Sequence, residues 1–298
     1  MIDPIVTVVI PTRNRVDLLR HAVASVMHQT EPNFELIVVD DGSADATPAY
    51  LAELVASEAR VRVVRNATAR GGAAARNAGI ASARARWVAF LDDDDEWLPV
   101  KLRRQLDLLA ADDSAVACSC HYIHSSVFGR SAVVSIPSEL TPERLLFDNP
   151  LGSASLCVAS TRVLRQIGGF DSRLRSCQDQ DIWLRLFAAG PILVCNEPLV
   201  RYRSHHGPRI SNDFRSQHAG ARRFFFKHRA AMDAAIRRRR VAFSCFLMSR
   251  QSTKTIRRRA RYLAIAARNA RLVEALRYLR SSGTRLLFDT LRRKSTTT

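Results

Sequence analysis

Long apolar runs, paired cysteines and nucleotide-binding glycine motifs are all missing from this chain of 298 residues. No uninterrupted apolar stretch approaches the ~20 residues that a membrane-spanning helix needs, so we expect no such helix. The N-terminus lacks the charged and then apolar pattern of a signal peptide. The six cysteines are scattered and form no Cys-x-x-Cys pair. This usage argues against a zinc site and a disulfide framework, and it fits a reducing cytoplasm.

The phosphate-binding motifs of other nucleotide enzymes are missing as well. The chain contains no GxxxxGKS or GxxxxGKT sequence, and no GxGxxG follows its first β-branched run. These absences argue against a nucleotidyl- or phosphate-handling α/β enzyme, although such an enzyme can also use aspartates and Mg²⁺. Hydrophobic residues make up 47% of the chain, enough for the core of one large domain or two modest ones.

Acidic residues are scarce in the last quarter of the chain. Residues 1–214 contain 23 lysines and arginines against 25 aspartates and glutamates, a net charge of −2. Residues 215–298 contain 23 against 3, a net charge of +20. Because this change in charge accompanies a change to arginine-rich helical segments, we predict a domain over residues 1–212 and a basic helical region over residues 213–298.

Short β-branched runs alternate with helical patterns through the first hundred residues. Buried strands are predicted at residues 5–10, 36–39, 61–64 and 87–91. Short loops and helices separate them, which predicts a βαβ series and a mostly parallel sheet with helices on both faces. The sequence therefore predicts an α/β fold with a Rossmann-like first half.

The pattern after residue 110 is less regular. Further strands are predicted at residues 116–122, 131–136, 153–160, 192–195 and 199–202, the first two as a candidate antiparallel pair. Helices are predicted from Pro99 to Ala110, after Thr141, over residues 161–167 and from Gln178 onward. We expect these elements to form a smaller half with a mixed sheet.

Four consecutive aspartates, Asp92–Asp95, end the strand predicted at residues 87–91. Like charges this close cannot all be ionised at low cost unless a cation neutralises them. Hard oxygen ligands at this density suit Mg²⁺ or Mn²⁺. The alternative is a solvated acidic turn before a helix, where carboxylates are also favoured.

Polar clusters follow three of the predicted parallel strands, at residues 11–14, 40–43 and 92–95. Ligands of such sheets bind at the carboxyl ends of the strands, where these clusters are expected to meet. The expected convergence favours a functional role for the aspartates over a solvated turn.

Six motifs occur in order along residues 5–211. They are VVIPTRNR at 8–15, VVDDGS at 38–43, ARNAG at 75–79, FLDDDD at 90–95, GGFD at 168–171, and QD at 178–179 leading into WLRL at 183–186. In order and spacing this set resembles the family 2 glycosyltransferases of the GT-A fold. The resemblance implies an inverting enzyme that uses Mn²⁺ or Mg²⁺. It would move a sugar from a nucleotide diphosphate sugar to a hydroxyl of a glycan or lipid-linked glycan. We expect the donor to be a UDP-sugar.

The resemblance also implies which residues bind the nucleotide. Asp41 would accept a hydrogen bond from the imide N–H of uracil, and Pro11, Thr12, Arg13 and Asn14 would flank the base. Arg13 stands where many members have an aromatic residue, and a guanidinium plane can also stack on a base. The alternative for Asp41 is a turn-forming residue, because Asp-Gly-Ser is turn chemistry in any protein.

The acidic run matches the Asp-x-Asp motif of the family at Asp92 and Asp94. Asp94 is the expected metal ligand, and Asp92 or Asp93 would bond the ribose or a metal-bound water. Such a metal bridges diphosphate oxygens and stabilises charge on the leaving group. His205 resembles a histidine near the metal or the diphosphate in some members, with His206 and a solvated loop as alternatives.

Asp179 matches the general base, which removes the proton of the acceptor hydroxyl as that oxygen attacks the anomeric carbon. The family usually has Glu-Asp where this chain has Gln178-Asp179. Asp181 is the rival, and because residues i and i+2 of a helix do not share a face, only one of the two should point into the cleft. Alternatively, both aspartates simply favour a helix N-terminus.

The remaining motif residues are expected around the acceptor and the diphosphate. Gly169, Phe170, Asp171 and Gln178 are assigned to the acceptor side, with packing as the alternative for Phe170. For Arg76 the sequence allows two alternatives, which are contact with the diphosphate and an ordinary position on a helix surface.

Aromatic residues interleave with arginines in the basic region. Arginine clusters at 237–240 and 257–259 alternate with apolar segments at 224–226 and 243–248. This pattern suits a helix in an anionic membrane interface, and it would also suit nucleic acid. We expect membrane contact through residues 215–298 and a cytoplasmic location at the inner face of the plasma membrane, with nucleic acid unlikely as a partner. The alternatives are helices packed on the first domain, or an inactive protein whose basic tail binds nucleic acid or membrane.

Overall fold

The structure is a computed structural model that describes residues 3–125, 130–203, 213–251 and 256–269. The chain divides into two compact units. The first is formed by Met1–Arg173 and Gln178–Gly207, and the second by Leu174–Cys177 and Pro208–Thr298.

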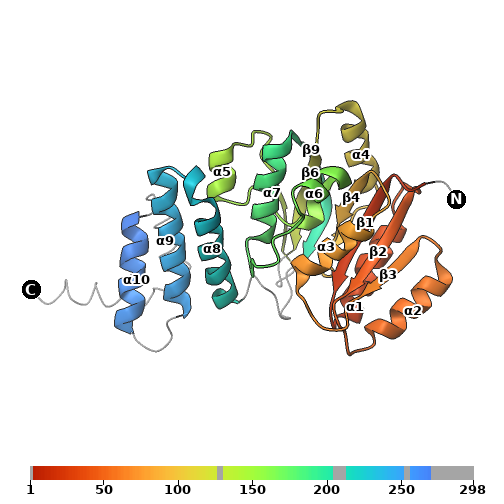
Figure 1. Ribbon diagram of the computed structural model, residues 1–298, viewed down its shortest axis with the longest axis horizontal. Coiled ribbons are helices and arrows are strands. Elements are labelled where there is room, and N and C mark those ends of the chain that lie inside the picture. Colours follow the sequence, from red (N-terminus) through yellow and green to blue (C-terminus); the bar gives the residue numbers. More distant parts are fainter. Residues whose placement is uncertain (1–2, 126–129, 204–212, 252–255, 270–298) are drawn as a thin grey trace, which may run out of the picture. The chain divides into compact units, whose positions relative to one another are not determined.

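The first part of the chain forms the predicted parallel sheet with its helices (Figure 1). Its elements are β1 (Val6–Thr12), α1 (Val16–Met27), β2 (Phe34–Asp40), α2 (Thr47–Ser57), β3 (Val61–Arg65), α3 (Gly72–Ser82) and β4 (Trp87–Phe90). The strands lie in the order β3-β2-β1-β4, and every neighbouring pair is parallel. All seven residues of β2 are buried, as expected for a strand that is covered on both faces. The prediction of an α/β fold is confirmed.

The close approach of α3 to β1 depends on a glycine. A Cβ built on Gly79 would lie 2.3 Å from Cγ1 of Val9, a distance that real contacts do not reach. Only glycine therefore allows α3 to pack this tightly against the central strand. This packing fixes where α3 presents Arg76, three residues earlier in the chain.

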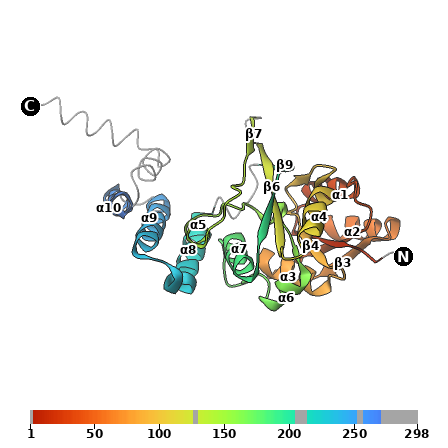
Figure 2. The same cartoon turned by 90° about the horizontal axis from the view of Figure 1, so that it is seen from above.

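The second part of the first unit extends the sheet with mixed strand directions. Its elements are β5 (Glu96–Trp97), α4 (Lys101–Ala111), β6 (Ala117–Ser125), β7 (Ser131–Val134), α5 (Pro142–Phe147), η1 (Ala154–Leu156), β8 (Val158–Ser160), α6 (Thr161–Gln166), α7 (Gln178–Ala189) and β9 (Ile192–Arg203). The full order is β3-β2-β1-β4-β8-β6-β9-β5, with β7 antiparallel to β6. β8 is antiparallel to both β4 and β6, whereas β9 is parallel to β6. The helices α1 and α4 lie on one face of the sheet, and α3 and α6 on the other (Figure 2).

Two predicted strands differ from the structure. The first part of the strand predicted at 153–160 is the 3-10 turn η1, because the Ser153 hydroxyl accepts a hydrogen bond from the N–H of Ser155 and starts a turn. The strands predicted at 192–195 and 199–202 form the single strand β9. Its register shifts where Pro198 pairs with His121, since proline has no N–H for the ladder.

The second unit contains three helices among its described residues. They are α8 (Phe214–His228), α9 (Ala234–Gln251) and α10 (Ile256–Asn269), with the turn η3 (Arg229–Ala231) after α8. The helices pack in sequence, α8 against α9 and α9 against α10 (Figure 1). None of the helices in the described ranges is long and apolar enough to cross a membrane.

Candidate active site

The polar clusters after β1, β2 and β4 lie at one edge of the sheet. β1 is hydrogen-bonded to β2 on one side and to β4 on the other, and all three strands run in the same direction. Their carboxyl ends therefore meet, as the sequence predicted. The mixed half of the sheet adds η1 and the first turn of α7 to this edge, through Ser155 and Gln178.

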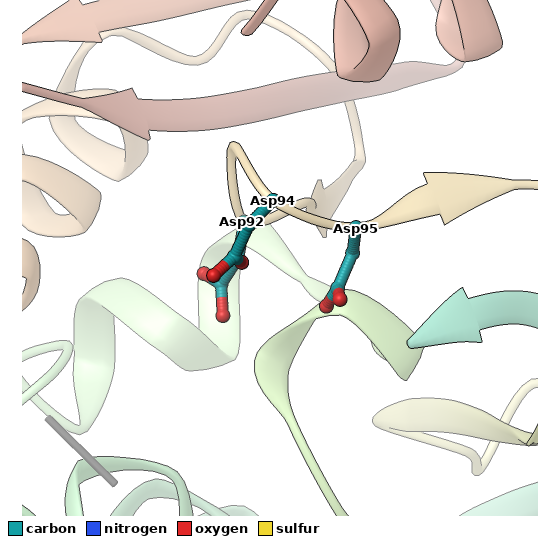
Figure 3. Close-up of side chains that lie close together, drawn as sticks. All are labelled: Asp92, Asp94 and Asp95. Carbon is teal, nitrogen blue, oxygen red and sulfur yellow. The ribbon is translucent and has the colours of Figure 1, made fainter. Parts of the chain in front are cut away.

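Three of the four consecutive aspartates form a compact cluster (Figure 3). Asp92, Asp94 and Asp95 each offer a carboxylate oxygen, and these oxygens lie within 4.8 Å of one another. A turn closed by the hydrogen bond from the N–H of Asp95 to the carbonyl of Asp92, 3.1 Å long, brings the side chains together. Three convergent carboxylates fit Mg²⁺ or Mn²⁺, which prefer oxygen ligands.

Hydroxyl groups from η1 hold two members of this cluster. The Ser155 hydroxyl donates to Oδ2 of Asp95 over 2.7 Å and accepts from the N–H of Asp92 over 3.0 Å. The Ser153 hydroxyl donates to Oδ2 of Asp92 over 3.2 Å. Asp95 is buried, with 1% of its surface exposed. Asp95 belongs to the acidic run predicted to hold the metal, but neither it nor the two serines is individually among the predicted site residues.

Asp93 points away from the cluster toward the end of β1. Its carboxylate accepts from the Thr12 hydroxyl over 2.8 Å and from Nη1 of Arg15 over 2.9 Å. Burial raises the pKa of Asp93 to about 6, against the lowering effect of the Arg15 guanidinium. Arg15 also lies 3.6 Å from Asp94 and so stands between two of the four carboxylates.

Arg76 is buried at the centre of the site, with 8% of its surface exposed. Its guanidinium forms an ion pair with Asp92, donates to Oε1 of Gln178 over 3.3 Å, and lies 5.4 Å from the centre of the Phe170 ring. The alternative of an ordinary residue on the helix surface is therefore wrong. The physical reason is the tight packing of α3, which turns this side chain inward.

Asp179 stands in the first turn of α7. Its Oδ1 is buried and has no hydrogen-bond partner among the described residues. Burial raises the pKa of Asp179 to about 6, the Arg76 guanidinium lowers it, and the charge of Asp92 raises it further. A carboxylate with a pKa in this range can accept a proton at neutral pH.

Asp181 occupies a different environment although it is only two residues away. It is fully buried, and its Oδ2 lies 2.7 Å from Nη2 of Arg185, one helical turn further on. The same guanidinium donates to the carbonyls of Ile167 and Gly169 over 2.8 and 2.6 Å. Asp181 thus anchors α7 to the segment that precedes it.

Gly169 and Phe170 are packing residues in this structure. The Phe170 side chain is buried with 2% exposed, and its ring meets the Phe90 ring edge-on, with centroids 5.2 Å apart. Gly169 has φ of 63°, and a Cβ there would lie 2.4 Å from Oδ1 of Asn77. Asp171 pairs with Arg173, two residues later, over 2.9 Å.

The Asp41 carboxylate organises the loop between β3 and α3. It accepts hydrogen bonds from the Asn66 side chain over 2.8 Å, from the N–H of Arg70 over 2.9 Å, and from the N–H of Gly71 over 2.7 Å. These contacts give Asp41 a loop-forming role, and its contact with uracil stays a prediction.

The residues expected beside the base join two loops. The Thr12 hydroxyl binds Asp93, and Asn14, at φ of 53°, accepts from the N–H of Ala44 over 2.7 Å. Pro11 pairs with Val39 in the sheet, and Arg13 is exposed. His205 lies outside the described residues.

Comparison with known proteins identifies the family of the chain. Residues 7–167 match glycosyl transferase family 2. A putative teichuronic acid biosynthesis glycosyltransferase from Bacillus subtilis, TuaG, is 30% identical over 72% of this chain and 84% of its own length. WfgD of Escherichia coli, a UDP-Glc:α-D-GlcNAc-diphosphoundecaprenol β-1,3-glucosyltransferase, is 29% identical over 72% of this chain and 83% of its own.

Solved structures share the fold. S. aureus TarS 1-349, crystallised with UDP-GlcNAc, superposes with a TM-score of 0.67 at 19% identity, over 89% of this chain and 81% of that one. The mannosyltransferase PcManGT from Pyrobaculum calidifontis, in complex with GDP-Man and Mn²⁺, gives 0.62 at 20% identity, over 99% and 84%. These matches confirm the GT-A type fold. The chain belongs to glycosyl transferase family 2 and is a glycosyltransferase.

Proposed function

We propose that the chain is a metal-dependent, inverting enzyme that transfers a sugar from a UDP-sugar to a hydroxyl of a glycan or lipid-linked glycan, as in cell-surface polysaccharide synthesis. The observation that carries this proposal is the position of Asp179. Its buried Oδ1, without a hydrogen-bond partner among the described residues, faces the charge of Arg76, which pairs with Asp92 of the acidic cluster. A proton acceptor and a set of carboxylates that suits a cation thus share one edge of the sheet.

Asp179 would take the proton of the acceptor hydroxyl while that oxygen forms its bond to the anomeric carbon. The bond from this carbon to the diphosphate oxygen breaks on the opposite face, so a single displacement inverts the anomeric centre. Arg76 would bind the diphosphate, which would compete with Asp92 for its guanidinium. Asp181 is a poor base, because Arg185 already holds its carboxylate.

Asp92, Asp94 and Asp95 would hold Mn²⁺ or Mg²⁺. A divalent cation supplies charge stabilisation to the leaving diphosphate. Ser153 and Ser155 orient two of these carboxylates, and Arg15 limits the repulsion around Asp93 and Asp94. Pro11, Thr12, Arg13 and Asn14 would flank the base, and Asp41, which holds the neighbouring loop, would accept a hydrogen bond from uracil.

The donor and acceptor classes rest on the relatives. The name of WfgD gives UDP-Glc as its donor and an undecaprenol-linked diphosphate sugar as its acceptor. TarS was crystallised with UDP-GlcNAc. By analogy, we assign a UDP-sugar as donor and a lipid-linked glycan as acceptor. PcManGT was crystallised with GDP-Man, so a guanine nucleotide is the control that tests the choice of base.

Membrane contact through residues 215–298 is part of the proposal. In α8, Phe226 is 53% exposed, and the guanidinium groups of Arg222 and Arg229 lie 5.7 and 6.0 Å from the centre of its ring. An exposed ring between cations suits an interface with anionic lipid headgroups. This contact would place the enzyme on the cytoplasmic face of the plasma membrane, beside a lipid-linked acceptor.

Calorimetric titration with UDP, with and without Mn²⁺, tests the site. Wild type should bind UDP more tightly with Mn²⁺, whereas Asp94→Asn should lose this metal dependence, because it removes a charged ligand of the cluster. Titrations with GDP and dTDP under the same conditions test which base the site binds. Equal binding of UDP to wild type and Asp94→Asn would contradict the metal site.

The second candidate is a chain that binds nucleic acid through its basic region. The net charge of +20 over residues 215–298 favours it. Binding of a polynucleotide with steep salt dependence, together with no response to any sugar nucleotide, would support this candidate over the transferase.

A further inference from the structure

A cavity of about 600 Å³ lies at the edge of the sheet opposite the aspartates. It is formed by the segment before β4, the segment before β6, and the junction of β8 with α6, all in the first unit. Trp87, which begins β4, lines the cavity, whereas Asp92 follows the end of that strand. Four residues of strand span roughly 13 Å, so a ligand here would not touch the candidate active site.

Four arginines line this cavity, namely Arg84, Arg86, Arg162 and Arg165, against the single carboxylate of Asp113. Arg84 and Arg162 are exposed, and in the part of the chain that the structure describes neither guanidinium has an ion-pair partner. Arg86 lies 3.5 Å from Asp113, but both side chains are largely exposed, so this pair is weak. The cavity is therefore strongly cationic.

Two of these arginines are held in place. Arg165 donates to the carbonyls of Ile80 and Ala83, at the end of α3, over 3.1 and 2.7 Å. The Arg86 guanidinium lies 5.2 Å from the centre of the Trp87 ring. The Thr161 hydroxyl, bonded to the carbonyl of Ala85 over 2.7 Å, fixes the two walls to each other. Arg165 and the walls of the cavity are thus fixed by hydrogen bonds before any ligand binds, which lowers the entropy lost on binding.

We propose that this arginine pocket, defined by Arg84, Arg86, Arg162 and Arg165, binds a phosphate or diphosphate group. Guanidinium forks match phosphate oxygens bidentately, and an excess of three positive charges favours a multiply charged group over a single carboxylate. The volume is within the range of about 300–1,000 Å³ that small-ligand sites occupy. The group can belong to a free phosphorylated molecule or to a lipid headgroup, and the site is independent of the transfer chemistry proposed above.

Titration of the full chain with pyrophosphate in EDTA tests the pocket. The double variant Arg84→Gln/Arg162→Gln should bind roughly tenfold more weakly or worse, the scale expected for lost charge-assisted hydrogen bonds. The matched control, Arg104→Gln/Arg144→Gln, removes two exposed arginines of α4 and α5 outside the cavity and should bind as wild type does. EDTA removes divalent cations, so pyrophosphate cannot bind through a metal ion at the aspartate site. Unchanged thermal unfolding of both double variants verifies their folding.

Flotation with phosphatidylglycerol vesicles distinguishes a lipid headgroup from a free phosphorylated molecule as the source of the bound phosphate group. If vesicle binding falls in Arg84→Gln/Arg162→Gln but not in the control, the phosphate is that of a lipid headgroup. If vesicle binding is unchanged while pyrophosphate binding falls, the ligand is a free phosphorylated molecule. If neither measurement responds to the double variant, or if the control variant loses as much pyrophosphate binding as the double variant does, the proposal is overturned.

Discussion

The parallel half and the mixed half of the sheet contribute different chemistry to the same edge. The parallel half supplies charged groups in pairs: Arg15 with Asp93, and Arg76 with Asp92. The mixed half supplies neutral hydroxyls, from Ser153 and Ser155, and one carboxylate oxygen, on Asp179, that has no hydrogen-bond partner among the described residues. The half with paired charges is suited to hold a ligand, and the half with an unsatisfied oxygen is suited to react with one.

This difference follows from the folding of each half. In the parallel half, loops after neighbouring strands place opposite charges side by side, and the pairing offsets the cost of burying them. In α7, Asp181 is paired with Arg185, whereas Oδ1 of Asp179 is buried with no hydrogen-bond partner among the described residues. Two aspartates in one helical turn thus stand in different environments.

The largest expected effect is the loss of transfer activity when Asp179 is replaced. Asp179→Asn should lower kcat by about 10²–10⁴-fold, the usual contribution of a general base, and leave the Kd for UDP nearly unchanged. Kinetics with a UDP-sugar and a lipid-linked acceptor, together with UDP titration, measure both quantities.

Asp181→Asn is the matched control for that experiment. It should retain kcat within a fewfold and instead lower the free energy of unfolding by about 3–5 kcal/mol, because it removes one charge of the buried pair with Arg185. Loss of transfer in Asp181→Asn with full activity in Asp179→Asn would reverse the assignment and break the contrast between the two carboxylates.

Much of the parallel half could be predicted from the sequence. The β-branched runs that became β1 and β2 are continuous because both faces are covered, and this pattern has few alternatives. The convergence of the loops after β1 and β4 followed from strand direction alone. The family motifs then matched residues that the structure brings to one edge, Arg76 and Gln178 among them.

The mixed half and the inward-facing side chains were harder to predict. Arg76 lies in an alanine-rich helix whose sequence does not show which face is covered, and its burial depends on the glycine contact between Gly79 and Val9. Ser153 and Ser155 fell within a segment predicted as strand, so their side chains had no expected direction. The sequence feature that could have indicated the turn is the Ser-x-Ser spacing, because a serine hydroxyl can accept a hydrogen bond from the N–H two residues later and start a 3-10 turn.

A smaller effect is expected at the hydroxyls of the mixed half. Ser155→Ala should weaken Mn²⁺-dependent UDP binding by about tenfold, the lower end for residues that orient metal ligands, because it removes the donor to Asp95 and the acceptor for the N–H of Asp92. Ser57→Ala, at an exposed position on α2, is the control. Wild-type affinity in Ser155→Ala would mean that the acidic loop holds its shape without the mixed half.

The smallest expected effect is a shift in the pH profile. Because Asp179 must be deprotonated to act as a base and its pKa is about 6, kcat should fall as the pH drops through 6. The Arg76 charge favours the carboxylate form, so Arg76→Gln should raise the pKa and move the acidic limb to higher pH, in addition to any loss in kcat. Arg15→Gln, which removes a charge facing Asp93 and Asp94, should leave this limb in place. If both variants move the limb equally, the titrating group belongs to the aspartate cluster, and the parallel half would then both bind the ligand and set the pH response.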